Sequence, residues 1–137
     1  MKPDLLSPAT AILIAFASAY FVPSAHAVET YVSGATVLNI RNYTDNRFGG
    51  CVMQLDKDVL VSGTQTLTEC NHADVVSLDC KGEFLSSKLS NQLFNSAQLA
   101  FVAGKKINVT VDDAKYHVDQ GGNKTTCVAT GIIVLDN

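Results

Sequence analysis

The residues best suited to chemistry in this chain gather around His117. The segment "DDAKYHVD" places it among Asp112, Asp113, Tyr116 and Asp119. A histidine among carboxylates can act as a general base or supply half of a metal site. The H-E-x-x-H and G-x-S-x-G motifs are absent from the sequence, as is the D-x-D-x-D-G spacing of a calcium loop. We therefore expect His117 to lie in a solvated loop, and we expect neither catalysis nor a metal or cofactor.

The four cysteines form a second group of reactive side chains: Cys51, Cys70, Cys80 and Cys127. An even number of cysteines in an exported domain is typical of disulfides, and two bonds are expected here. Zinc is the alternative, but the sequence contains no C-x-x-C pair. Three pairings are possible. We favour Cys51–Cys70, which would join adjacent strands, and Cys80–Cys127, which would tie the third strand to the last.

Export is indicated by residues 1–27, which have the features of a signal peptide. Lys2 gives a basic start, residues 9–22 form an apolar run, and "SAHA" has the small-x-small pattern of a cleavage site. The alternative is a membrane anchor, but the apolar run is shorter than the ~20 residues that span a bilayer. We predict cleavage after Ala27, which leaves residues 28–137 as one secreted or periplasmic domain without a membrane span.

The charge of the chain argues against nucleic acid as a partner. The net charge is −3, and no basic run is longer than Lys105-Lys106. Binding to nucleic acid depends on neutralising several phosphates, which this composition does not support.

The stretch "FNSAQLAFVAGKKINVTVDD" changes its apolar period from three or four residues to two, which predicts a helix followed closely by a strand. The helix is expected over residues 86–103, with Ser86 or Ser87 as its N-cap and Gly104 at its C-terminal end. Its buried stripe is predicted to contain Leu89, Leu93, Ala97, Ala100 and Phe101, with Phe94 beside it.

Five other segments have strand-like composition or alternation: residues 31–42, 50–62, 74–80, 106–113 and 125–136. Three strands, one helix and two strands is the element order of an OB-fold, a five-stranded Greek-key barrel with a helix between its third and fourth strands. We therefore predict a mainly β OB-fold whose helix closes one end of the barrel. A small sandwich with an incidental helix is the alternative.

The strand ending in "SLDCKG", followed by "LFNSAQLAFVAGKKINVTVDD", a cysteine and a final apolar strand, resembles a family of small secreted bacterial proteins. These are the B subunits of AB-type toxins, such as the subtilase-cytotoxin B subunit and the small pertussis-toxin subunits. The resemblance covers residues 33–135 and is one of element pattern. It implies an OB-fold, a ring of five subunits, binding to cell-surface glycans and a possible A-type partner. It assigns no glycan-contacting residue, and the chain lacks the tryptophan that such sites often contain.

The predicted helix has a polar face with few charges: Asn91, Gln92, Asn95 and Gln98. The resemblance implies a ring of five subunits in which this helix face lines a central pore. Amide side chains there would avoid the repulsion that five aligned charges would cause. A polar face on a monomer is the alternative.

Two loops, residues 43–48 and 116–123, mix aromatic or imidazole rings with amides and carboxylates, which suits the binding of sugar hydroxyls. The candidate ligand-binding residues are Tyr43, Asp45, Asn46, Arg47, Tyr116, His117 and Asp119. We therefore expect a non-catalytic receptor-binding module that works as a homo-oligomer, most simply a pentamer. The alternative is a monomeric periplasmic or secreted protein that binds another protein, in an inhibitory or envelope role.

Overall fold

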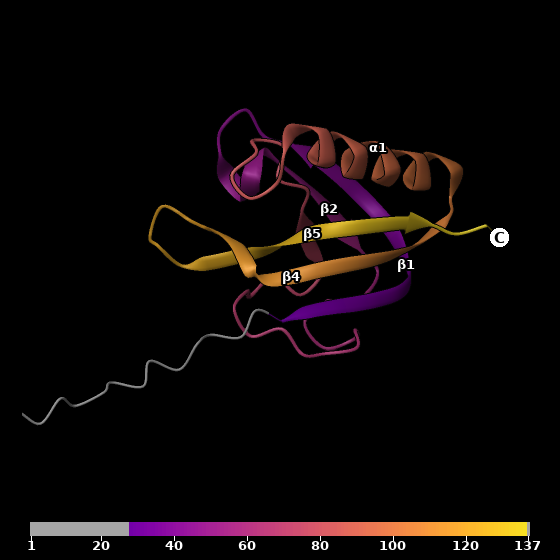
Figure 1. The fold of residues 1–137 in the computed structure, drawn as a ribbon, viewed down its shortest axis with the longest axis horizontal. Coiled ribbons are helices and arrows are strands. Elements are labelled where there is room, and N and C mark those ends of the chain that lie inside the picture. The colour runs from indigo at the N-terminus through magenta and orange to yellow at the C-terminus, as the bar shows by residue number, and fades with distance from the viewer. Residues whose placement is uncertain (1–27, 137) are drawn as a thin grey trace, which may run out of the picture.

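The computed structural model describes residues 28–136, so the predicted signal peptide lies outside the described residues. The chain is mainly β with one α-helix (Figure 1), which confirms the predicted class. Its elements are β1 (Glu29–Asn42), a short 3-10 turn η1 (Arg47–Gly50), β2 (Cys51–Leu55), β3 (Val75–Ser77), α1 (Ser87–Ala103), β4 (Lys106–Val118) and β5 (Lys124–Val134).

The five strands form one sheet in the order β1-β2-β3-β5-β4, and the sheet closes because β1 also pairs with β4. All pairings are antiparallel except the short contact of β3 with β5, which is parallel and joins Ser77 to Val128. The long strands β4 and β5 form a hairpin that extends beyond the body of the sheet (Figure 1). Residues of β4 also contact η1.

The core lies inside the closed sheet and is built by alternating residues. Ile107, Val109 and Val111 of β4 are fully buried, as the period of two in the sequence predicts. Val32 on β1 and Met53 on β2 are also fully buried. Each strand thus turns one row of side chains inward, and the burial of this apolar surface is the main source of stability.

The helix begins and ends as predicted. The side chain of Ser86 accepts a hydrogen bond from the backbone N–H of Leu89 (3.3 Å), and Gly104 has the left-handed φ of 62° that ends many helices. The helix packs against β1 and β5 through a narrow stripe of small and apolar residues: Ser90, Leu93, Ala97 and Ala100. The prediction that Phe101 joins this stripe is wrong, because its side chain is 48% exposed. It follows Ala100 by one residue, about 100° around the helix.

Strands β2 and β3 are shorter than predicted. The alternation after Leu55 does not continue as a strand, because Asp58 accepts a hydrogen bond from the backbone N–H of Leu60 (2.8 Å) and turns the chain. Val59 is still fully buried, so its apolar character reflects packing of this loop residue into the core. In the third segment Asp79 has a positive φ of 52°, which ends the extended backbone soon after β3.

Two disulfides are present, as predicted, but the favoured pairing is wrong. The bonds join Cys51 to Cys80 and Cys70 to Cys127, with Cα–Cα distances of 5.6 and 5.5 Å. Antiparallel pairing sets the start of β2 opposite the end of β3, where the backbone N–H of Leu78 donates to the carbonyl of Cys51 (3.1 Å), and this brings Cys80 within reach of Cys51. The segment after Cys70 runs beside β5, where the backbone N–H of Asn71 donates to the carbonyl of Thr125 (3.0 Å). Pairing between neighbours in the sheet, rather than order along the chain, therefore decides the bonds.

Candidate functional site

A cavity of about 800 Å³ opens where η1, the loop before α1 and the β4–β5 hairpin meet. Its lining mixes aromatic rings with charged and amide groups: Asp45, Asn46, Arg47, Phe48, Glu83, Phe84, Tyr116, His117, Val118, Asp119, Gln120 and Gly121. A concave site with apolar walls and a few polar groups is the usual form of a binding pocket. This cavity is therefore the candidate functional site.

The two loops selected from the sequence both line this cavity, although about 70 residues separate them along the chain. All the candidate ligand-binding residues line it except Tyr43. Tyr43 lines a smaller neighbouring cavity of about 190 Å³ together with Phe48 and His72. The ring of Phe48 borders both cavities, with its centroid 5.5 Å from those of Tyr43 and His72.

Sequence reasoning missed Glu83 and Phe84, which come from the loop between β3 and α1. Their side chains are 43% and 40% exposed. The signal that could have identified them is a charged residue next to an aromatic one directly after a predicted turn. Their position beside residues of the β4–β5 hairpin depends on tertiary structure and is not encoded locally.

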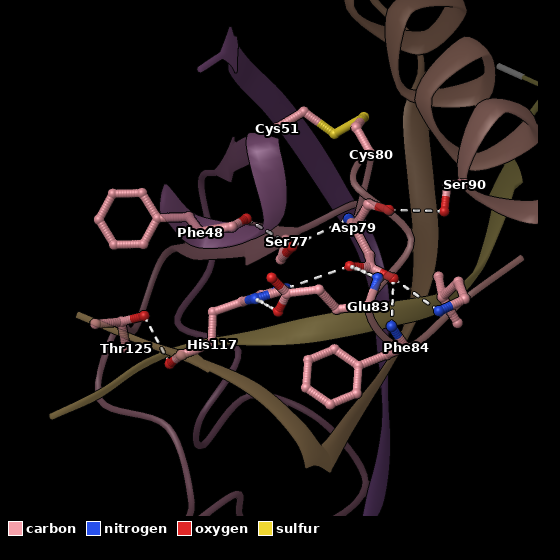
Figure 2. Close-up of polar contacts among 11 residues, drawn as sticks. Phe48, Cys51, Ser77, Asp79, Cys80, Glu83, Phe84, Ser90, His117 and Thr125 are labelled. Atoms are coloured by element: carbon pink, nitrogen blue, oxygen red, sulfur yellow. Dashed lines mark hydrogen bonds and ion pairs between the residues drawn. A yellow bond between two sulfur atoms is a disulfide. The ribbon is translucent and has the colours of Figure 1, made fainter. Parts of the chain in front are cut away.

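The prediction that His117 lies in a solvated loop is wrong. It lies near the end of β4, which continues past the predicted boundary, and its side chain is 3% exposed. Figure 2 shows the ring held between two carboxylates: Nδ1 lies 3.1 Å from Oε2 of Glu83, and Nε2 lies 3.6 Å from Oδ1 of Asp79. The Nε2 atom has no hydrogen-bond partner within the described part of the chain. The Phe84 and His117 rings pack in a T-shaped arrangement, with their centroids 5.1 Å apart.

The fully buried Asp79 carboxylate organises the loop that carries Glu83 and Phe84. Its Oδ1 accepts from the backbone N–H of Glu83 (3.1 Å), and its Oδ2 accepts from those of Phe84 (2.8 Å) and Leu85 (2.7 Å). Its backbone carbonyl accepts from the hydroxyl of Ser90 at 2.9 Å, which connects the loop to α1 (Figure 2). A buried carboxylate satisfied by three N–H donors fixes this loop firmly. Asp79 therefore positions two side chains of the cavity.

The turn that packs against His117 requires a glycine. Gly49 has a φ of 73°, and a Cβ atom there would lie 2.7 Å from Oγ of Ser77 and 2.8 Å from Cε1 of His117. The adjacent Phe48 is also in the left-handed region, with a φ of 53°, which is unusual for an aromatic residue. Its carbonyl accepts a hydrogen bond from the Ser77 hydroxyl (2.8 Å), which holds the turn in this conformation.

Several charges around the cavity are already paired. A hydrogen bond from the Arg47 side chain holds the pKa of Asp45 below its usual value, and the same contact raises the pKa of Arg47. The side chain of Asn123, followed by backbone N–H groups of the hairpin loop, lowers the pKa of Asp119. The carboxylates of Asp45 and Asp119 stabilise their own loops, so they have less hydrogen-bonding capacity for a ligand than their exposure implies.

The Ser77 hydroxyl, which lies near His117, is not positioned as a nucleophile. Ser77 is fully buried, and its hydroxyl donates to the carbonyl of Phe48 and accepts from the backbone N–H of Asp79 (3.0 Å). A nucleophile must reach a substrate atom as well as its base, which this serine does not. Within residues 28–136 no group of three or more histidine, cysteine or acidic side chains is placed to hold a metal ion.

Among the described residues, no helix is both long and apolar enough to cross a membrane. No family model, no curated protein and no solved structure matches this chain.

Proposed function

We propose that residues 28–137 form an OB-fold. Three features support this proposal: the closed strand order β1-β2-β3-β5-β4, the parallel contact of β3 with β5, and the position of α1 between β3 and β4 in the chain. The fold itself says little about function, which depends on the site.

We propose that this protein is a non-catalytic binding module that recognises a cell-surface glycan or glycoprotein, in the manner of the toxin B subunits it resembles. The observation that carries the proposal is the cavity between η1 and the β4–β5 hairpin. Sugars bind to sites that combine aromatic surface with carboxylate and amide groups. The cavity lining supplies that combination through Phe84, Tyr116, Glu83 and Gln120. The buried, fully engaged hydroxyl of Ser77 supports a binding role over a catalytic one.

Assembly into a ring, most simply a homo-pentamer, is part of the proposal. Four amide residues of α1 are exposed and carry no charge: Asn91, Gln92, Asn95 and Gln98. Near the C-terminal end of the same helix, Leu99 and Val102 are 60% and 84% exposed. Exposed apolar side chains beside an uncharged polar face are typical of a surface that contacts another subunit. A toxin A-type subunit is a further possible partner in the same proposal.

We propose a secreted or periplasmic location in a bacterium. The support is the two disulfides, which persist in oxidising compartments, together with the predicted signal peptide.

The test combines light scattering of the mature, oxidised protein with a screen on a glycan array. We expect a mass that is a multiple of the monomer and binding to a defined set of glycans. Weak single sites gain avidity when several are presented together, so oligomer and glycan binding should appear in the same preparation. A monomer that binds no glycan would contradict the proposal and favour the role of a protein-binding envelope component.

A further inference from the structure

Glu83 is the acidic residue of the cavity that retains free acceptor capacity. Asp45 accepts from the Arg47 guanidinium (2.8 Å), and Asp119 accepts from the backbone N–H groups of Gly121 (2.8 Å) and Asn123. Among residues 28–136, the carboxylate of Glu83 has one polar partner, Nδ1 of His117 at 3.1 Å.

Phe84 places an aromatic surface next to this carboxylate. Its ring is 40% exposed and lines the same cavity, with the Tyr116 ring also in the wall. A carboxylate accepts strong hydrogen bonds from hydroxyl groups, and an aromatic ring packs against the apolar C–H face of a sugar. Both groups are preorganised, because Asp79 accepts from the backbone N–H groups of Glu83 and Phe84.

The charge of the cavity discriminates between classes of sugar. Its lining contains the carboxylates of Asp45, Glu83 and Asp119 against one guanidinium, and that guanidinium is already bonded to Asp45. An acidic sugar would bring its carboxylate towards Glu83 without a free cation to compensate, and like charges repel more strongly in a partly desolvated cavity.

We infer that the ligand of this cavity is a neutral sugar ring, which donates hydroxyl hydrogen bonds to Glu83 and packs against Phe84, and that acidic sugars are excluded. This inference rests on the proposed glycan-binding function and names the class of glycan. His117 acts as a positioning residue here, because its Nδ1 fixes the Glu83 carboxylate on the cavity wall.

The experiment uses an array of matched glycans, each present with and without a terminal sialic acid, together with amino-sugar counterparts. The mature protein is compared with Glu83→Gln and with Glu29→Gln, the same substitution at a position outside the cavity. We expect the neutral member of each recognised pair to bind more tightly. Glu83→Gln should weaken that binding about tenfold, since a charge-assisted hydrogen bond becomes a neutral one, and should reduce the discrimination against sialic acid. Glu29→Gln should behave as the parent protein.

The outcomes separate the inference from the function on which it rests. Tighter binding of the sialylated members would overturn the inference and leave glycan binding intact. Tighter binding of amino sugars would show that positive charge selects the ligand, and would overturn it as well. Equal losses of glycan affinity in Glu83→Gln and Glu29→Gln would show that Glu83 does not contact the ligand, and would overturn the inference. Binding of no glycan by the parent protein would refute the proposed function itself. Amide NMR spectra of both variants check that the fold is retained.

Discussion

Replacing Gly49 by alanine should destabilise the protein more than the same change at a left-handed glycine that has open space around it. The added Cβ atom would lie 2.7 Å from Oγ of Ser77 and 2.8 Å from Cε1 of His117, well inside van der Waals contact. The φ of 73° adds a backbone cost of about 1–2 kcal/mol for a residue with a Cβ atom. Forcing an atom into a packed site costs a further ~1–3 kcal/mol. The expected loss in the free energy of unfolding is therefore about 2–5 kcal/mol.

Gly122 provides a matched control for this prediction. It has a φ of 77°, and a Cβ atom there would meet nothing within 4 Å. Gly122→Ala should therefore show the backbone cost alone, about 1–2 kcal/mol. Urea unfolding of the oxidised proteins, followed by circular dichroism, measures both values.

The difference between the two variants isolates the steric contribution of the site. A Gly49→Ala protein that is no less stable than Gly122→Ala would refute the packing of Gly49 over His117. Adding His117→Ala should recover part of the loss, since one of the two crowded partners is then removed. The same loss in both backgrounds would mean that the imidazole does not lie against the turn.

Three further predictions follow from the fold. Non-reducing peptide mapping should link Cys51 to Cys80, and a different partner for Cys51 would contradict the sheet pairing. Replacing both cysteines by alanine should lower the free energy of unfolding by about 3.5 kcal/mol, because the bond closes a loop of 29 residues. Ser86→Ala should cost about 1 kcal/mol in thermal unfolding through loss of the helix cap, and an unchanged midpoint would argue against this cap. Because Asn123 lowers the pKa of Asp119, an NMR titration should give this carboxyl a midpoint below the ordinary 3.8. Its contribution to stability should be present above the unfolded pKa and be lost as the pH falls through the lowered folded value, and a midpoint above 3.8 would contradict the loop geometry.

Local signals in the sequence were sufficient for the helix and for most strands. Ser86 and Gly104 mark the ends of α1 because capping depends on the few residues at each end. The alternation of Ile107, Val109 and Val111 identifies β4 because one face of that strand is buried. The C-terminal end of β2 was not predictable from alternation, because Val59 lies in a loop and is buried in the core as a strand residue would be.

The sequence identified the two loops of the site but not how they come together. Residues 43–48 and 116–123 carry polar and aromatic side chains that stand out in the sequence, but their meeting depends on strand order. The burial of His117 was not predictable, since the residues that enclose it, Gly49, Asp79 and Glu83, come from other segments. The disulfide pairing failed for the same reason: it follows the pairing of β2 with β3, which the sequence order does not specify.

The most direct test of the binding cavity is an NMR titration of the mature, oxidised protein with the neutral glycan that binds best on the array. We expect saturable shifts of the amide signals of residues 45–48, 83–84 and 116–121, which line the cavity. The amides of the polar face of α1, from Asn91 to Gln98, should stay unchanged under conditions that hold the oligomeric state constant. Saturable shifts confined to α1 or to another surface, with the cavity signals unmoved, would contradict the claim that this cavity is the binding site.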